Sequence, residues 1–427
     1  MRYGWLRVGL LVGGLAGGGG AAAEETATAA VAPATRAINA LGLDLLRKAT
    51  GDGNAVISPY SIQSALAMTY AGAAGDTKTE MARVLHFPDD ETGLHRSFAA
   101  LQRSLGQIET RTAEIAKRSK KTGGLSEPVT LRVASRLYGQ TGYQFRAAFL
   151  ALLNNTYRAS FEPMDFRNNA AAAIESINAW IARQTAGRIP DLIRAGGLRP
   201  DTRLALVNAV YFKASWQHRF TVRETIPRFF RVSGSKPAAV PTMETVSDFG
   251  YAEHDDFTAV TLPYIGGQIQ LLIVLPAIGK DLARVEAQLS AELLATLAHA
   301  KAREVILFLP KLKSDSPAMS LGPALQSLGL RQAFDQPPGS ANFDRIAPRH
   351  PDDNLALSAV LHKTFLVLDE GGAEAASASA GVAVAAAHVS DPKPRPIEVR
   401  VDRPFLFAIQ HRQSGACLFL GRVTDPR

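Results

Sequence analysis

The sequence predicts one large domain of the α+β class. Its N-terminal part has the apolar spacing of amphipathic helices, whereas its centre and C-terminal part contain apolar runs typical of buried strands. These strands and helices mix without regular β–α–β alternation, and no linker or internal repeat divides the chain. With 427 residues and 46% hydrophobic composition, the chain is long enough to bury a large core.

The first 23 residues have the features of a secretory signal peptide. Arg2 and Arg7 give a positive start, residues 8–16 are apolar and rich in glycine, and Ala21 to Ala23 form a small-residue cleavage site. An N-terminal membrane anchor is the alternative, but the apolar run is short, and no later stretch is apolar enough to span a bilayer. We therefore expect a secreted protein, extracellular or periplasmic, that is not held in a membrane.

Behind the signal peptide, residues 24–34 are rich in Ala, Thr and Glu and are expected to form a flexible tail. Residues 35–427 are expected to form the single domain. The helices expected in it cover residues 35–46, 59–71, 76–85, 170–186, 281–300 and 317–328. Two of them have predicted caps: Ser58 with Pro59 in the first turn behind it, and Asp76. The expected strands cover residues 129–138, 203–212, 259–264, 269–275, 305–309, 355–368, 405–409 and 417–423.

A lone cysteine and one basic run are the other features of the composition. Cys417 lies in an apolar run and has no partner for an internal disulfide, so we expect a buried side chain rather than a reactive thiol. The tightest basic run could contact a polyanion such as a heparin-like glycan, or could be an ordinary solvated group of charges. This run consists of Lys117, Arg118, Lys120 and Lys121.

A tract of small residues near the C-terminus is the most informative feature of the sequence. From Gly371 to His388 it contains no bulky side chain larger than valine apart from Glu374 and the final histidine, and no proline occurs before Pro392. A flexible surface loop over residues 371–396 is one interpretation. A loop this long inside a compact domain is unusual, and such loops tend to be functional.

The second interpretation is that the tract is a latent strand. In a strand, alternate side chains from Ala373 to Gly381 would face one side and would all be small, as a face entering a packed core requires. Glu374 falls on the opposite, outward side. Gly371 and Gly372 provide a hinge, and no proline removes a hydrogen-bond donor along the way.

The chain resembles the serpins from about Thr35 to Pro426. The resemblance rests on an ordered set of motifs, each weak alone: residues 54–62, 178–181 with 185–189, 208–216, 240–243, 305–311, 370–378 and 402–407. It implies three β-sheets, eight or nine helices, an exposed C-terminal reactive loop and a metastable native state. A target protease cuts the loop and is held as an acyl-enzyme while the loop inserts into the large sheet.

The resemblance also assigns roles to individual residues. It implies an inhibitory hinge made of Glu370, Gly371, Gly372, Ala373, Glu374, Ala375, Ala376, Ser377 and Ala378. Serpins are cut sixteen residues after the glutamate that resembles Glu370, which gives Ala386–Ala387 as the reactive bond. The stretch from Ala387 to Pro404 is longer than is common in the family, so Ala385 or Ala387 could instead precede the cut.

Two further sites follow from the resemblance. Ser58, Asn208 and His362 resemble a polar cluster beneath the large sheet, where strands must part; their separate roles as a cap, a strand polar residue and a satisfied histidine are the alternative. Trp216 resembles the tryptophan under the point where the loop enters, and it could equally be a core aromatic.

Together these residues predict an irreversible inhibitor of serine proteases rather than an enzyme. Small residues before the cut suit elastase-like or subtilisin-like proteases, whose shallow pockets accept alanine. No motif of a hydrolase, metalloprotease or nucleotide-binding site is present, and we expect no metal, cofactor or nucleic-acid partner. The expected partner is one protease per monomer, in a covalent complex. A non-inhibitory serpin acting as a carrier or folding helper is the alternative.

Overall fold

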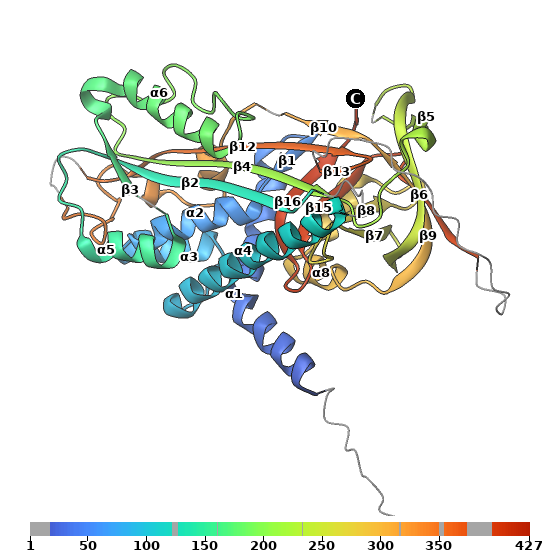
Figure 1. Cartoon of the computed structure of the whole chain (residues 1–427). Helices are drawn as coiled ribbons and strands as arrows, with labels where there is room; N and C mark the ends of the chain where they lie inside the picture. Colours follow the sequence, from blue (N-terminus) through green and yellow to red (C-terminus); the bar gives the residue numbers. More distant parts are fainter. Residues whose placement is uncertain are drawn as a thin grey trace, which may run out of the picture.

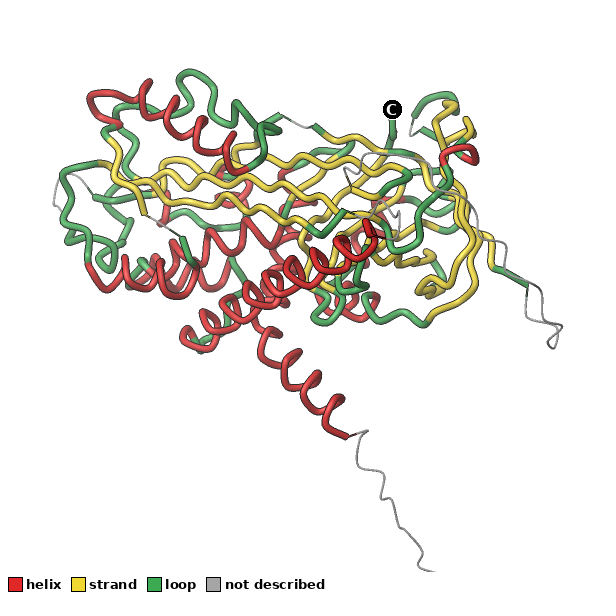
Figure 2. Tube along the Cα trace, in the orientation of Figure 1, coloured by secondary structure: helices red, strands yellow, loops and turns green. Residues whose placement is uncertain are grey.

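The computed structural model describes residues 18–121, 127–159, 161–232, 234–315, 317–349, 354–373 and 395–427. Two hydrogen-bonded sheets cross the molecule, one long and nearly flat and one strongly bent, with helices around them (Figures 1 and 2). The mixture of helices and sheets confirms the α+β class. In the described part of the chain, no helix is long and apolar enough to cross a membrane.

The large sheet is ordered β10-β12-β13-β4-β2-β3, and β11 pairs with β12 at one end. Its long central strands, β4 and β12, run parallel and pair directly over Leu204–Tyr211 and Leu357–Phe365. Its strands are β2 (Thr130–Gln140), β3 (Phe161–Met164), β4 (Leu204–Ser215), β10 (Leu312–Ser314), β11 (Met319–Ser320), β12 (Leu357–Asp369) and β13 (Gly372–Ala373).

The second sheet is ordered β1-β16-β15-β8-β7-β6-β9-β14, and β5 pairs with β6. It contains two halves joined through β6, because β6 pairs first with β5 and β9 and only its last residues pair with β7. The strands therefore form two hydrogen-bonded sheets where three were expected. Its strands are β1 (Ala55–Ile57), β5 (Ile226–Phe230), β6 (Ala238–Glu253), β7 (Phe257–Pro263), β8 (Ile269–Pro276), β9 (Ala302–Pro310), β14 (Ile397–Arg400), β15 (Phe405–His411) and β16 (Ala416–Val423).

The helices cover both faces of the large sheet (Figure 1). On one face α6 packs through Ile174, Ile177 and Ile181 on small and branched residues of β2 and β4. On the other face α2 lies beneath β2 and β4, within the main core that extends to the second sheet. The helices are α1 (Gly18–Ala49), α2 (Pro59–Ala71), α3 (Gly75–Val84), α4 (Glu91–Lys121), α5 (Ala147–Leu152), α6 (Phe166–Gln184), α7 (Leu282–Gln288), α8 (Ala291–Leu297) and α9 (Gly322–Ser327), with short η1 (Leu153–Tyr157), η2 (Val222–Glu224) and η3 (Gln332–Phe334).

Four local expectations are wrong. The helix expected over residues 317–328 covers only α9, because Met319 and Ser320 pair with β12 as β11. Residues 24–34, expected as a flexible tail, lie within α1, because their alanines favour helix and Val31 and Ala34 are buried. The single helix expected over residues 281–300 is two, since Ser290 begins α8 by accepting the Leu293 N–H. Asp76 does not cap α3, which starts one residue earlier, although its carboxylate in the first turn still suits the helix dipole.

Two expectations about single features are met. Ser58 caps α2 by accepting the Ser61 N–H, with Pro59 in the first turn. Cys417 is fully buried, and burial raises the pKa of its thiol to about 12, which keeps it protonated and unreactive at neutral pH.

The basic run from Lys117 to Lys121 forms the exposed last turn of α4, where positive charge interacts favourably with the helix dipole. Its contact with a polyanion stays a prediction.

Candidate functional site

The chain turns back at the end of β12 and enters the large sheet as the two-residue strand β13. Ala373 lies opposite Leu368 of β12 on one side and Ala214 of β4 on the other, and both pairings are antiparallel. Ala373 is fully buried there. Below it, β4 and β12 close on each other in parallel. The sheet is therefore parted at one end by the start of the small-residue tract and closed along the rest of its length.

Gly372 is required where the hinge passes β4. Its φ is +142°, and a Cβ atom on it would lie 2.0 Å from the Ala214 carbonyl oxygen. A side chain there would meet both a disfavoured backbone conformation and a direct clash with backbone. The sequence expectation of a glycine hinge thus corresponds to a position at which only glycine fits this close approach.

Asp369 holds the turn that precedes β13. Its Oδ1 accepts the N–H groups of Gly371 at 2.8 Å and Gly372 at 3.2 Å. Burial raises the pKa of this carboxyl, although the two N–H groups oppose the rise. The backbone carbonyl of Asp369 accepts the Trp216 indole N–H at 2.8 Å. Sequence reasoning did not single out Asp369.

Trp216, which the resemblance assigns to the point of loop entry, lies under this turn. Its backbone N–H donates to the Gly371 carbonyl at 3.0 Å, and its ring stacks on Tyr264 with centroids 4.4 Å apart and planes 10° apart. The indole is almost completely buried. Trp216 therefore joins the hinge to the second sheet through both its backbone and its ring.

Glu370 anchors the base of the hinge. Its carboxylate accepts a hydrogen bond from Lys311 Nζ at 2.9 Å, and its backbone carbonyl accepts the Phe220 N–H. Burial alone would raise the pKa of Glu370, but the hydrogen bond and charge of Lys311, together with hydrogen bonds from the backbone and from Thr225, keep the pKa below its ordinary value. Glu370 is therefore an ionised residue that is held in place at the base of the hinge.

The structure brings Ser58, Asn208 and His362 together beneath the closed part of the sheet. His362 of β12 and Asn208 of β4 are register partners, and His362 Nδ1 lies 2.8 Å from Asn208 Oδ1. The Ser58 backbone N–H donates to His362 Nε2 at 3.0 Å. Because Nε2 is an acceptor, the ring proton sits on Nδ1 and the histidine is neutral. Burial lowers the pKa of His362 to about 3, so it stays neutral at physiological pH.

Two further serines, which the sequence did not indicate, complete this cluster. Ser61 Oγ donates to Asn208 Oδ1 at 2.7 Å, and Asn208 Nδ2 donates to Ser135 Oγ at 2.6 Å. Ser61 lies one helical turn after the predicted cap Ser58, and this spacing could have indicated Ser61 from the sequence. Ser135 carries no such signal, because it meets Asn208 only through the β2–β4 register.

Comparisons with known proteins agree with this geometry. The family described as Serpin (serine protease inhibitor) has a model that matches residues 36–426. This chain belongs to the serpin family. A serpin-like protein of Thermococcus kodakarensis is 36% identical over 92% of this chain and 86% of its own length. The leukocyte elastase inhibitor of Bos taurus is 34% identical over 88% of this chain and 93% of its own.

Solved serpin structures have the same fold. Tengpin, a thermophilic serpin in its native state, matches with a TM-score of 0.77 at 24% identity, over 92% of this chain and 94% of its own. Thyroxine-binding globulin in complex with thyroxine matches with a TM-score of 0.75 at 26% identity, over 92% of this chain and 99% of its own. The serpin fold expected from the sequence is thus confirmed.

Part of the serpin site lies outside the described residues. This applies to the predicted reactive bond, Ala386–Ala387, and to the hinge residues from Glu374 to Ala378. Of the predicted hinge, the structure places Glu370, Gly371, Gly372 and Ala373. Among the described residues, no group of three or more His, Cys, Asp or Glu side chains could hold a metal ion.

Proposed function

We propose that this serpin is a secreted, monomeric, irreversible suicide inhibitor of elastase-like or subtilisin-like serine proteases, and that it catalyses no turnover itself. The observation that carries the proposal is the position of β13: Gly372 and Ala373 lie between β12 and β4 and pair antiparallel with both strands. The hinge already occupies the first two positions of a strand that could continue down the sheet. The sequence that follows it is small enough to do so.

The chemistry requires one covalent step by the protease. The protease serine oxygen attacks the Ala386 carbonyl carbon, the Ala386–Ala387 amide bond breaks, and the amine of Ala387 leaves with a proton. Ala386 then remains as an ester on the serine. Hydrolysis of that ester would release both proteins, so inhibition requires that the loop insert first.

The sheet supplies a driving force for insertion. At present β4 and β12 share one parallel ladder over about eight residues, and parallel pairing is slightly less stable per residue than antiparallel pairing. An inserted strand would replace this ladder with two antiparallel ones. At about 1 kcal/mol net per hydrogen bond, ten additional bonds would contribute on the order of 10 kcal/mol.

The cluster around His362 opposes premature insertion. Separating β4 from β12 requires breaking the bond between His362 and Asn208, and the other buried bonds of the cluster depend on the same arrangement. A buried polar network of this kind is costly to disrupt unless a larger gain follows. Cutting the loop provides that gain because it frees one end of the tract to enter the sheet.

Two kinds of support favour an elastase-like target. The residues before the predicted bond are alanines and valines, which fit shallow specificity pockets. Relatives named leukocyte elastase inhibitor occur among the similar proteins from Bos taurus and Homo sapiens. Secretion rests on the predicted signal peptide in residues 1–23.

Incubation with pancreatic elastase and with a subtilisin tests the proposal. Denaturing electrophoresis should show a protease–serpin complex that survives boiling, and mass spectrometry of the released C-terminal peptide should begin at Ala387. Complete cleavage of the loop with no stable complex would reject inhibition and favour the carrier or folding-helper alternative.

A further inference from the structure

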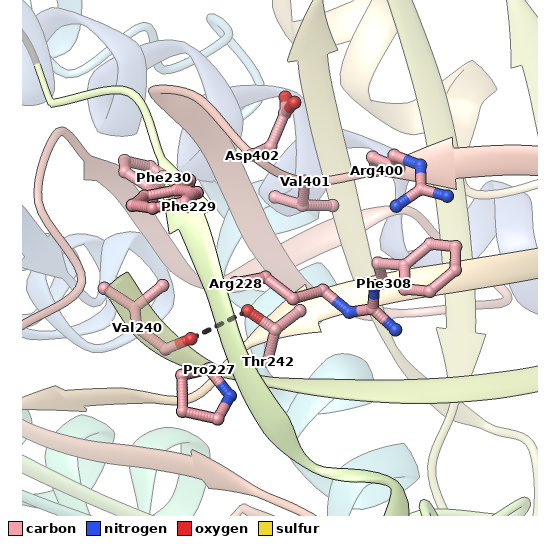
Figure 3. Close-up of a pocket in the computed structure, with 10 residues that line it drawn as sticks. All are labelled: Pro227, Arg228, Phe229, Phe230, Val240, Thr242, Phe308, Arg400, Val401 and Asp402. Atoms are coloured by element: carbon pink, nitrogen blue, oxygen red, sulfur yellow. Dashed lines mark hydrogen bonds between the residues drawn. The ribbon is translucent and has the colours of Figure 1, made fainter. Parts of the chain in front are cut away.

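The carboxylate of Asp369 takes its hydrogen bonds from backbone N–H groups and not from a cation. Charged side chains elsewhere in the structure are paired differently. In the pocket over Phe308, Arg228 and Arg400 are both directed toward the ring (Figure 3), and each also pairs with a carboxylate beside it. The bonds of Asp369 therefore shape the backbone of the hinge, whereas those arginine pairs balance a charge.

The turn after Asp369 is not the kind that a two-residue hairpin favours. Asp369 pairs with Gly372, which leaves Glu370 and Gly371 as the loop. Hairpins with such loops favour a positive φ at the first loop residue, because this matches the twist of the strands. Neither Glu370 nor Gly371 has a positive φ, and the positive value occurs at Gly372 instead. The hairpin is therefore not fixed by its own backbone preference and depends on contacts that hold it.

A second strand register is open to the same sequence. Three-residue loops that contain a glycine are also common in hairpins, and residues 370–372 would form such a loop. That loop would place Glu374, the next residue after Ala373, opposite Leu368 of β12. Because Leu368 lies in the main core, a strand that began in this way would carry a carboxylate into the core. One residue of slip thus separates a strand that fits the sheet from one that does not.

The side chain of Asp369 holds the observed register. Its Oδ1 accepts the N–H groups of Gly371 at 2.8 Å and Gly372 at 3.2 Å, which is how an aspartate at the first position of a turn fixes the backbone after it. The acceptor is itself fixed, because the Asp369 carbonyl accepts the indole N–H of Trp216, an almost completely buried side chain. Ala373 follows directly and is fully buried. The carboxylate thus determines which residue is the first to face the core.

We propose that Asp369 is a positioning residue that sets the register in which the reactive loop enters the large sheet. The inference rests on the proposed inhibitory function and adds to it what decides the outcome of each cleavage. After the cut, the ester on the protease is either hydrolysed or trapped by insertion. A loop that starts in the wrong register has to withdraw before it can insert, which gives hydrolysis more time. Loss of the carboxylate therefore raises the share of proteases that escape without changing how fast the loop is cut.

The stoichiometry of inhibition, measured with pancreatic elastase and with a subtilisin, tests this role. The stoichiometry less one is the ratio of proteases that escape to proteases that are trapped. Asp369→Ala should raise this ratio about tenfold, as expected for the loss of hydrogen bonds to a charged group. The second-order rate constant of loop cleavage should stay as in wild type. Asp369→Asn keeps an uncharged oxygen acceptor and should lie between wild type and Asp369→Ala.

Asp281→Ala is the matched control. Asp281 caps α7 by accepting the Ala283 N–H at 3.2 Å, so this variant loses the same kind of bond from the same side chain, outside the hinge. It should give the wild-type stoichiometry. Equal ratios in wild type and Asp369→Ala would overturn the positioning role. An increase of the same size in Asp281→Ala would also overturn it, because general destabilisation would then explain the effect.

Thermal melting of the nicked proteins separates register from inhibition, because it requires a cut loop but no covalent complex. The bonds of Asp369 are made before the cut and kept after it, so their loss alone lowers the thermal midpoints of intact and nicked protein equally. A mixed register should instead make the rise on nicking smaller in Asp369→Ala than in wild type.

The two failures therefore give different results. If the rise on nicking depends on Asp369 although no protease is trapped, the positioning role holds and the inhibitory function fails. If complexes form normally, and both the stoichiometry and the rise on nicking are equal in wild type and Asp369→Ala, the inhibitory function holds and the positioning role fails.

Discussion

His362 on β12 and Asn208 on β4 lie directly opposite each other in a parallel ladder and are joined by a hydrogen bond of 2.8 Å. The two strands they join are those between which β13 has already entered. The bond therefore joins the two strands that the proposed insertion would separate, and the protonation of His362 should affect how firmly these strands stay together.

Lowering the pH should weaken the intact protein through His362. Its pKa is about 3 in the fold and about 6.5 when unfolded, so the unfolded chain binds more protons between these values. The stabilisation is complete above pH 6.5 and is lost as the pH falls toward 3. At pH 4.5 the loss from this residue is about 2–3 kcal/mol.

Urea unfolding at pH 7.5 and 4.5 measures this effect. His411 is also buried with a pKa lowered to about 4, so wild type alone does not isolate His362. His362→Gln lacks the titrating ring and should lose less stability on acidification than wild type. Equal losses in the two proteins would rule out His362 as the source.

Ala373→Arg should convert the inhibitor into a substrate. Ala373 is fully buried between β12 and β4, where an arginine would leave a charge without a partner. We expect elastase to cut the loop at an unchanged rate and then to escape, so that denaturing gels show cleaved serpin in place of complex. Ala151→Arg, at an exposed position of α5, is the control and should inhibit normally. Stable complexes with Ala373→Arg would contradict insertion through this hinge.

Lys311→Met should destabilise the native state by about 1–2 kcal/mol, because Glu370 would keep its buried charge without a partner. Adding Glu370→Gln to this variant should restore part of the loss, since the uncompensated charge is then removed. Lys313→Met alters an exposed lysine two residues away and should change stability by less than about 0.5 kcal/mol. The measurement is the free energy of unfolding in urea for all four proteins.

Cutting the loop should raise the thermal midpoint of the protein, not lower it. A gain of about 10 kcal/mol from two new ladders corresponds to a shift on the order of 10 °C in a domain of this size. Calorimetry before and after limited elastase digestion measures this shift. The Ala373→Arg protein, cut in the same way, should gain much less. A cleaved wild type that melts where the intact protein does would show that the native sheet stores no strain.

The sequence predicts the elements whose environment is uniform along their length. β4 and β16 are buried on both faces, so their apolar runs are continuous and their positions are read directly. β5 and β14 escape prediction because they are short and carry Pro227 or alternating charges. Whether these segments form strands depends on pairing with β6 and β9, respectively.

The residues of the candidate site divide in the same way, into those that the sequence indicates and those that only the fold brings together. Ser58, Asn208 and His362 are found through the family resemblance, and their mutual contacts come from the fold. Asp369 and Ser135 have no signal in their own surroundings, because one acts through a turn that glycines complete and the other through strand register. The hinge is predictable because its composition departs from everything around it, whereas its two-residue entry into the sheet is visible only in three dimensions.

The two last strands of the chain lie in the interior of the second sheet: β16 between β1 and β15, and β15 between β16 and β8. Both strands therefore stay paired with strands that precede the predicted cut, with Phe407 and Phe419 in the core. Cleavage of the backbone yields two polypeptides that stay together in one folded protein. The smaller, C-terminal fragment is released only when the protein unfolds. The nicked molecule keeps the scaffold against which the larger piece can rearrange, so one broken peptide bond changes how the chain is connected without taking the protein apart.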